Sequence, residues 1–195
     1  MKNVIIISGT PGTGKTTISR ILAEQINAEH VDISKLAQEE HLIIVRDETR
    51  DTDIVDIKAI RSRVTKIIRS SKGGVIIDGH YAPEVTNPKY TSKVIVLRRD
   101  PWFLKAELMK RGYSNLKIKE NLEAELIGIC LFDALQYQSQ EKICEIDTSN
   151  QRYDETVKEI LDTISIEKQC KYGKIDWLGK PETKDLLKEL MECMS

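Results

Sequence analysis

The sequence predicts an α/β fold in which helices cover both faces of a five-stranded parallel sheet. Short runs rich in Val and Ile recur along the chain, and stretches with helical periodicity lie between them. The runs are apolar throughout and do not alternate with polar residues, which is typical of strands covered on both faces. Strands of this kind in alternation with helices form parallel sheets with helices on either side.

Each strand is expected where an apolar run is bounded by turn-forming or charged residues. The clearest runs are Val4 to Ile7, Val75 to Ile77 and Val94 to Leu97, and weaker ones lie around Val31 and at Ile143 to Ile146. These runs account for the five strands.

Apolar stripes with helical spacing predict a helix after Lys15 and another before the glycine pair Gly73 and Gly74. Asp100 and Pro101 suit the N-cap and the first position of a third helix. The other helical features are the end of that third helix at Arg111 and Gly112, a long charged pattern from Ser114 to about Gln140, a helix near Arg152 to Ile164, and a Leu-rich amphipathic helix in the tail.

Two stretches interrupt this alternation. Residues Val45 to Asp56 are dense in charge and poor in core residues, so we expect an exposed loop there. The segment from Ser165 onward is appended to a fold that residues 1–164 already complete. We expect this extension, residues 165–195, to cover the domain or to contact a partner.

Composition excludes several classes of protein. A chain of 195 residues with 40% hydrophobic content fits one compact domain, and its net charge of −1 provides no polycation for coating DNA or a membrane. The four cysteines form no CxxC pair, so we expect neither a zinc site nor a disulfide framework, and thiols suited to a reducing cytosol. The first apolar run is far too short for a signal sequence or a membrane span, which predicts an intracellular protein.

The most specific motif is GTPGTGKT, which begins at Gly9 directly after the first strand and continues into a helix. It fits the phosphate-binding pattern G-x-x-x-x-G-K-[ST] and predicts a P-loop NTPase fold. Glycines allow the backbone N–H groups of such a loop to surround phosphate, and the following helix N-terminus adds positive potential. The expected ATP-binding residues are Gly9, Gly12, Thr13, Gly14, Lys15, Thr16 and Thr17.

The roles of these side chains follow from their chemistry. Lys15 supplies a point charge for the β- and γ-phosphates, and the Thr16 hydroxyl suits Mg²⁺. A P-loop enzyme also needs a carboxylate at the end of a neighbouring strand, and Asp78 ends the run Val75 to Ile77. We expect Thr16 and Asp78 to form the metal site; the alternative is that Asp78 only caps the next turn.

Three classes of P-loop protein compete. Guanine-specific switches usually carry an N-K-x-D segment, which this chain lacks, and mechanical ATPases normally extend well beyond the nucleotide core. A small-molecule kinase is therefore favoured, and such kinases use mobile arginines to neutralise transition-state charge. The candidates are Arg98, Arg99 and Arg111, of which Arg111 suits a lid; its alternative role is to complement a helix dipole.

These motifs, together with LAQEE at Leu36 to Glu40, GGVIIDGH, VIVLRRDP and RGYSNLKIKENLEAE, resemble the adenylate kinase isoenzyme 6 family, the small CINAP-like adenylate kinases of archaea and eukaryotic nuclei. The resemblance spans roughly Lys2 to Ile164. It implies an NMP-binding insertion at about residues 32–54 and a lid at about 110–120, from which Arg111 reaches ATP. It also implies cytoplasmic location, or nuclear location in a eukaryote.

The resemblance further implies phosphoryl transfer from ATP to AMP, with ATP hydrolysis and a role in maturing the small ribosomal subunit through a ribosomal protein of the pre-30S or pre-40S particle. Leu36 would lie near the acceptor base. Where the family has an arginine before the Glu pair, this chain has Gln38, so Arg46 and Arg50 are the candidates for holding the acceptor phosphate. Direct RNA binding has weak support, since basic residues are not interleaved with aromatic ones.

His80 distinguishes two reactions. An acceptor phosphate is already anionic, whereas hydrolysis requires a neutral water to be oriented and to lose a proton. An imidazole two residues beyond Asp78 could do this, so His80 is a candidate catalytic residue with Lys15, Asp78 and Arg111. The alternative is a loop histidine bonded to backbone, and we expect only structural or surface roles for His30 and His41.

Overall fold

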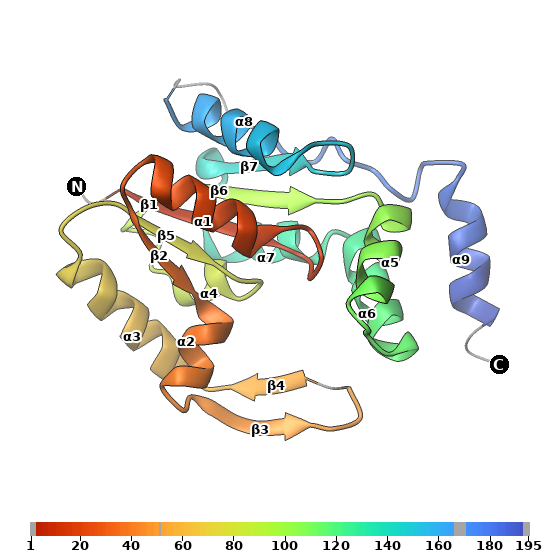
Figure 1. Ribbon diagram of the computed structural model, residues 1–195, viewed down its shortest axis with the longest axis horizontal. Helices are drawn as coiled ribbons and strands as arrows, with labels where there is room; N and C mark the ends of the chain where they lie inside the picture. Colours follow the sequence, from red (N-terminus) through yellow and green to blue (C-terminus); the bar gives the residue numbers. More distant parts are fainter. Residues whose placement is uncertain (1–2, 51, 166–170, 193–195) are drawn as a thin grey trace.

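The computed structural model of the protein describes residues 3–50, 52–165 and 171–192. Its main sheet has five parallel strands in the order β2-β5-β1-β6-β7 (Figure 1). The predicted three-layer α/β P-loop fold is confirmed. The strands are β1 (Val4–Gly9), β2 (Glu29–Asp32), β5 (Val75–Asp78), β6 (Thr91–Arg98) and β7 (Ile143–Asp147).

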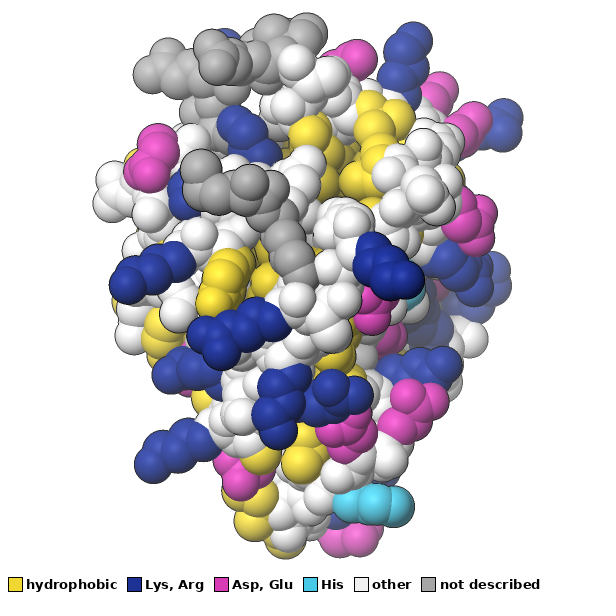
Figure 2. All heavy atoms as spheres, turned by 90° about the vertical axis from the view of Figure 1, so that its left-hand side faces the viewer, with side chains coloured by type: hydrophobic (Ala, Val, Ile, Leu, Met, Phe, Trp, Pro, Cys, Tyr) yellow, Lys and Arg dark blue, Asp and Glu magenta, His cyan; other side chains and the backbone are white. Residues whose placement is uncertain are grey.

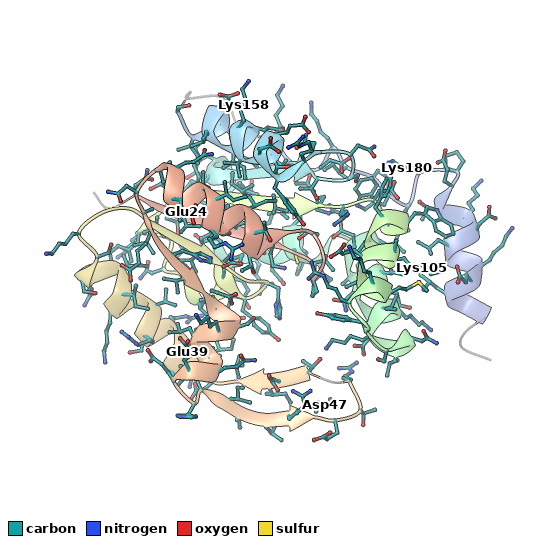
Figure 3. The ribbon with its side chains drawn as sticks, viewed as in Figure 1. Glu24, Glu39, Asp47, Lys105, Lys158 and Lys180 are labelled. Atoms are coloured by element: carbon teal, nitrogen blue, oxygen red, sulfur yellow. The ribbon has the colours of Figure 1, made fainter. Side chains whose placement is uncertain are left out.

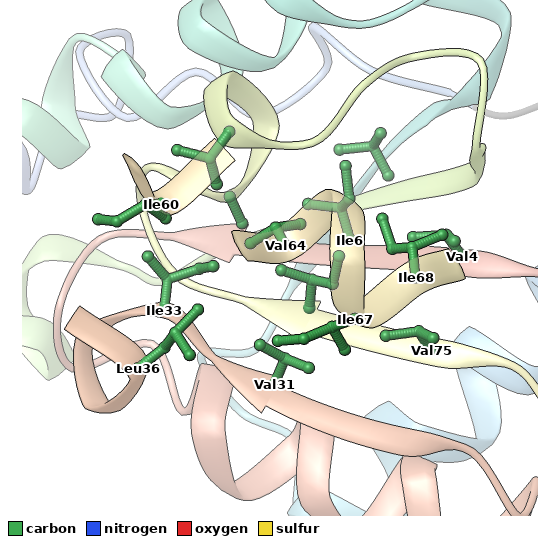
Figure 4. Packing of buried hydrophobic residues seen from close by; sticks show 14 of the residues in the cluster. Val4, Ile6, Val31, Ile33, Leu36, Ile60, Val64, Ile67, Ile68 and Val75 are labelled. Atoms are coloured by element: carbon green, nitrogen blue, oxygen red, sulfur yellow. The ribbon is translucent and has the colours of Figure 1, made fainter. Parts of the chain in front are cut away.

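Each face of the sheet contributes to a separate apolar layer, because successive residues of a strand point to opposite faces. Val4 and Ile6 of β1 pack into one cluster with α3, α4 and α7, whereas Ile5 and Ile7 pack into another with α1 and α8. Figure 4 shows the first cluster, with Val4 and Ile6 facing the side chains of α3. The helices are α1 (Lys15–Gln25), α3 (Ile57–Ser70), α4 (Ala82–Val85), α7 (Ile129–Tyr137) and α8 (Tyr153–Ser165).

The segment expected to bind the nucleoside monophosphate, residues 32–54, contains more structure than expected. After α2 (Ile33–Glu39), strands β3 (Ile43–Asp47) and β4 (Thr52–Val55) pair antiparallel and extend away from the main sheet (Figure 1). The expectation of an exposed loop at Val45 to Asp56 is therefore wrong. The charged residues lie on a thin ribbon with little core, so its strands lack the apolar signal of the main sheet.

The long charged pattern after residue 114 forms two helices and not one. Helix α5 (Pro101–Lys110) begins at the predicted N-cap Asp100 and is followed by α6 (Asn115–Leu126). Gly128, with φ at 69°, separates α6 from α7. Because that backbone conformation is unfavourable for residues with a Cβ, the chain turns at the one residue that tolerates it.

The described part of the C-terminal extension packs on α5 and α6. Helix α9 (Thr183–Glu192) lies beside α5 in Figure 1. Lys105 of α5, labelled in Figure 3, pairs with Glu189 of α9 at 2.5 Å. A third apolar cluster joins Trp177 and residues of α9 to α5 and α6. Its buried members are Leu104, Leu108, Ile118, Leu122, Leu126, Trp177, Leu186 and Leu190.

The cysteines differ from the sequence expectation. Cys130 is free and buried, but Cys144 is disulfide-bonded, so the prediction that no disulfide forms is wrong. The partner of Cys144 lies outside the described residues. Sequence spacing does not reveal which cysteines the fold brings near each other; here the backbone N–H of Glu145 donates to the Lys171 carbonyl at 2.9 Å, which sets the extension beside β7.

Charge on the surface is mixed. On the face shown in Figure 2, Lys and Arg side chains are interspersed with Asp and Glu, in keeping with the near-neutral net charge.

A short 3-10 helix, η1 (Gln140–Lys142), precedes β7. Within the described residues, none of the helices has the length and apolar character that crossing a membrane requires.

Candidate active site at the carboxyl edge of the sheet

A cavity of about 530 Å³ lies where the strands of the sheet end. The P-loop lines one side of it, α2 and the β3–β4 hairpin line another, and the α5–α6 connection lines a third. The lining residues with polar or charged side chains are Lys15, Thr16, Thr17, Asp32, Ser34, Gln38, Thr52, Asp53, Asp78, His80, Tyr81, Arg111, Tyr113 and Lys117.

The P-loop connects β1 to α1 through glycines that other residues could not replace. A Cβ on Gly9 would lie 2.5 Å from the Leu97 carbonyl oxygen of β6. Gly14 is the N-cap of α1 with φ at 92°, and a Cβ there would meet the Tyr153 ring at 2.9 Å. The loop therefore sits close against both β6 and the start of α8, with the α1 N-terminus directed at the cavity.

Lys15 lies at the start of α1. Its ammonium donates to the Thr10 carbonyl at 3.2 Å, and the Thr13 hydroxyl donates to the same oxygen at 2.9 Å. Burial lowers the pKa of Lys15, while the negative charges of Asp78 and Asp32 act in the opposite direction. A polyanionic phosphate would compensate this desolvated charge.

Asp78 is buried at the end of β5 and faces the P-loop. The Thr16 hydroxyl donates to its Oδ2 at 2.8 Å, and His30 Nε2 lies 2.7 Å from its Oδ1. Asp32 Oδ2 lies 3.5 Å from the same Thr16 hydroxyl. The structure thus brings together the two residues predicted as the metal site, Thr16 and Asp78.

This donor set fits Mg²⁺. Mg²⁺ prefers oxygen ligands and is usually held by one or two carboxylates together with substrate phosphates, and not by an all-protein cage. One hydroxyl and two carboxylates face the same space, and the described residues contain no cluster of three or more His, Cys, Asp or Glu side chains able to bind a metal by themselves.

Sequence reasoning missed Asp32 and His30. Asp32 ends β2 and pairs in register with Asp78 of β5, so two neighbouring strands end in carboxylates. It also caps α2 by accepting from the Lys35 N–H at 3.0 Å. The signal was weak because β2 is short and mostly polar, Glu29-His30-Val31-Asp32. His30, for which we expected a structural or surface role, has a structural role at the site through its contact with Asp78.

His80 follows Gly79 at the turn after β5 and lines the cavity. Its ring packs against Tyr81 with centroids 3.8 Å apart. Burial, and then the charges of Lys15 and Lys117, lower the pKa of His80 to about 4. The imidazole is therefore neutral at physiological pH and has a nitrogen lone pair that can accept a hydrogen bond.

The three candidate arginines lie in different places. Arg111 caps α5, lines the cavity and donates to Glu107 at 2.7 Å, which lowers the pKa of Glu107. Arg98 is buried and bonded to Glu125 and Glu145, so its candidacy as a mobile arginine is wrong. Inward and outward positions alternate along a strand, and the sequence pair Arg98-Arg99 does not say which residue points in.

Arg99 has a different environment from Arg98. Its guanidinium donates to the Gly12 carbonyl at 2.8 Å, so it holds the P-loop backbone from outside the main cavity. It also lines a second cavity of about 350 Å³ beside the P-loop. Residues around that cavity include Thr13, Thr148, Gln151 and Tyr153.

The acceptor candidates are not gathered in the cavity. Arg46 pairs with Asp53 at 3.2 Å and Arg50 pairs with Glu120 at 3.0 Å, and neither lines it. Leu36 is packed in the core cluster with α3, while its neighbour Gln38 faces the cavity.

Lys117, which sequence reasoning did not single out, brings a cation to the side of the cavity that the β3–β4 hairpin lines. It lies in the first turns of α6 and donates to the Arg50 carbonyl at 3.0 Å and to the Thr52 hydroxyl. The start of α6 and the β3–β4 hairpin are therefore in contact beside the cavity. The only indication of Lys117 in the sequence was its position in the expected lid, where several lysines occur.

Sequence comparison agrees with this geometry. The chain matches the family described as "AAA domain" over residues 5–128. It is 36% identical over 176 residues to a Methanocaldococcus jannaschii protein named "Putative adenylate kinase", covering 90% of this chain and 93% of the relative. A protein of the same name from Saccharolobus solfataricus is 33% identical over 195 residues, covering 98% and 96%. The chain belongs to the P-loop nucleoside monophosphate kinase superfamily.

Solved structures agree on the fold of this superfamily member. Shikimate kinase from Bacteroides thetaiotaomicron superposes with a TM-score of 0.57 at 16% identity, covering 85% of this chain and 99% of that one. A gluconokinase from Sinorhizobium meliloti gives 0.56 at 16% identity, covering 84% and 91%. At this identity the likeness concerns the arrangement of strands and helices.

Proposed function

We propose that the protein is a nucleoside monophosphate kinase that transfers the γ-phosphoryl group of ATP to AMP. The observation that carries the proposal is a cavity with the P-loop and a metal-compatible oxygen set on one side and the β3–β4 hairpin on the other. Such a cavity can hold two phosphorylated substrates in line. The names of the relatives support the same activity.

The donor nucleotide would lie along the P-loop. Lys15 and the backbone of the loop bind the β- and γ-phosphates, and the second cavity beside Thr13 and Tyr153 offers room for the nucleoside. Thr16, Asp78 and Asp32 would hold Mg²⁺, which when bound with ATP neutralises charge on the β- and γ-phosphates. His30 fixes the orientation of the Asp78 carboxylate.

Transfer to the acceptor needs alignment and charge neutralisation. An oxygen of the acceptor phosphate forms the new bond to the γ-phosphorus as the bond to the bridging oxygen of ADP breaks, so no proton has to be removed. Arg111 and Lys117 bring positive charge to the space above the P-loop as the lid covers it. Gln38, Thr52 and Asp53 surround the acceptor half of the cavity.

A coupled assay tests the proposal. With Mg²⁺-ATP and each nucleoside monophosphate in turn, we expect ADP formation with AMP, and its loss in Lys15→Met. Absence of diphosphate formation with every monophosphate, from protein that binds ATP, would exclude a monophosphate kinase and leave a P-loop kinase of another small molecule.

ATP hydrolysis is a second activity supported by His80. A neutral imidazole that lines the cavity can accept a hydrogen bond from water and so orient it toward the γ-phosphate. His80→Asn should lower phosphate release from ATP alone by about a hundredfold, the lower end of the usual range for a general base, and affect ADP formation with AMP much less. Equal losses in both reactions would contradict a special role of His80 in hydrolysis.

The ribosomal role implied by the resemblance stays a prediction. The physiological activity would then be that of a nucleotide-dependent assembly factor, with kinase activity incidental. Its test is co-purification with a small-subunit ribosomal protein in the presence and in the absence of ATP. Failure to recover such a complex in either state would contradict it.

A further inference from the structure

Glu125 of α6 is a buried carboxylate that lies behind the P-loop and outside the cavity lining. Its Oε2 accepts from the Thr10 hydroxyl at 2.6 Å. Its Oε1 accepts from Arg98 Nε at 2.7 Å, from Trp177 Nε1 at 2.9 Å and from the Arg99 backbone N–H at 3.2 Å. A charge so fully removed from water is stable only where donors of this kind surround it.

The bonds continue from Glu125 into the phosphate site. Thr10, whose hydroxyl binds Glu125, uses its carbonyl oxygen to accept from Lys15 Nζ and from the Thr13 hydroxyl. The position of Thr10 therefore affects the resting position of the phosphate-binding lysine. Two hydrogen bonds and one residue separate Glu125 from that ammonium group.

The bonds also continue from Glu125 into the C-terminal extension. The Trp177 indole is 1% exposed and packs in the apolar cluster with α5 and α6. The Lys180 ammonium lies 4.2 Å from the centre of its ring and also pairs with Asp100 at 3.2 Å. Figure 3 shows Lys180 in the segment that leads to α9. The indole ring is thus held in place by apolar packing and by the Lys180 ammonium.

We propose that Glu125 is a positioning residue for the phosphate loop, and that Trp177 of the C-terminal extension fixes Glu125 for this role. The extension would then act on nucleotide binding without touching the nucleotide. The inference rests on the proposed binding of ATP at the P-loop. Its consequence is that loss of one indole N–H weakens ATP binding although the apolar packing around the ring is largely kept.

Two matched substitutions test the inference. Trp177→Phe removes the bond to Glu125, whereas Trp102→Phe removes an indole N–H that donates to the Glu182 carbonyl at 3.1 Å and is unrelated to Glu125. Calorimetric titration with Mg²⁺-ATP should give a dissociation constant about fivefold higher in Trp177→Phe, the scale of one hydrogen bond, and unchanged in Trp102→Phe. In assays, KM for ATP should rise more than kcat falls.

A second pair of variants tests the role of Glu125 without changing the packing of Trp177. Thr10→Val removes the hydroxyl that binds Glu125 and should weaken ATP binding, whereas Thr10→Ser retains a hydroxyl and should restore it. The chain has only two tryptophans, so Trp102→Phe leaves Trp177 as the sole indole. Saturating Mg²⁺-ATP should shift its emission in that variant, and the shift should disappear when Thr10→Val is added.

The outcomes separate the two proposals. If the wild-type protein binds ATP but Trp177→Phe and Thr10→Val bind it as tightly as wild type, the role of Glu125 is overturned and the proposed kinase function is untouched. Equal weakening of ATP binding in Trp102→Phe and Trp177→Phe would also overturn it. So would Trp177 emission that does not change when ATP is added. Failure of the wild-type protein to bind ATP would overturn the proposed function itself.

Discussion

At the residue scale, Asp78 has one contact that the local sequence predicts and another that depends on the fold. Its place after an apolar run, downstream of a P-loop, was enough to predict that it faces Thr16. Its second partner, His30, belongs to a strand with a weak apolar signal, and the contact depends on the pairing of β2 with β5. Strand order is a property of the whole fold, so the sequence did not reveal the partner.

His80 gives a prediction on pH. Its pKa of about 4 in the folded protein lies below the ordinary value of 6.5, so between these values the unfolded chain binds the extra proton. This contribution to the free energy of unfolding is complete above about pH 6.5 and is lost as the pH falls toward 4. Between pH 7 and pH 5 the wild-type protein should lose about 1–2 kcal/mol more than His80→Gln in urea denaturation.

The same residue can be followed by NMR. The chain has three histidines, and His80→Gln identifies the relevant signal. Titration of the ligand-free protein should show one imidazole that stays neutral well below pH 6. Negative charge from bound Mg²⁺-ATP should raise that pKa, since Lys15 and Lys117 now lower it. A pKa near 6.5 in the ligand-free protein would contradict the buried environment.

Lys117 gives a prediction on substrate binding. Because it brings positive charge to the acceptor half of the cavity, Lys117→Met should raise KM for AMP about tenfold, the scale of one charged contact, and KM for ATP less. Lys119→Met is a matched control, since Lys119 lies on the same helix but does not line the cavity. Equal effects of the two substitutions would argue against a direct role for Lys117.

At the scale of elements, the sequence predicted what buried apolar runs determine and missed what exposed segments do. The strands β1, β5 and β6 were identified most clearly because their Val and Ile residues are covered on both faces. The β3–β4 hairpin was missed because Ile44, Val45 and Ile54 are exposed and separated by charges. The break at Gly128 was missed because the helical pattern continues on either side of it.

Gly128 gives a prediction on this break. Its φ is 69°, and a Cβ would lie 3.4 Å from an Arg98 guanidinium nitrogen, so Gly128→Ala should lower the free energy of unfolding by about 2 kcal/mol. Gly112 has φ at 74° with no atom within 4 Å of a Cβ, so Gly112→Ala should cost about 1 kcal/mol from backbone conformation alone. Urea denaturation of both variants measures the difference, and equal losses would show that crowding at Arg98 is unimportant.

At the scale of the whole molecule, the described part of the C-terminal extension packs against the helices α5 and α6. The sequence left open whether it covers the domain or contacts a partner, because an amphipathic helix serves both. The structure describes α9 and Trp177 against α5 and α6, where they bury Leu104, Leu108 and Leu122. This contact could not be predicted from the sequence, because the residues of α5 and α6 are far along the chain from those of the extension.

Truncation tests this role of the extension. A chain that ends at Ser165 loses Trp177, Leu186 and Leu190 from the cluster and should lose about 5 kcal/mol of unfolding free energy, at roughly 1.5–3 kcal/mol for each buried side chain. A chain that ends at Lys180 keeps Trp177 and should lose less. Thermal and urea denaturation should rank wild type above the Lys180 truncation and that above the Ser165 truncation; equal stability of all three would contradict the account.

The central claim is that the main cavity and the second cavity beside the P-loop together accept two nucleotides and align their phosphates for transfer. A crystal structure with a bisubstrate mimic, in which a phosphate chain joins the two adenosines of ATP and AMP, tests this most directly. We expect the donor phosphates on the P-loop at Lys15, one adenosine beside Tyr153, and the other between Gln38 and the β3–β4 hairpin. A mimic held by the P-loop alone, with its second adenosine outside the cavity, would contradict the claim.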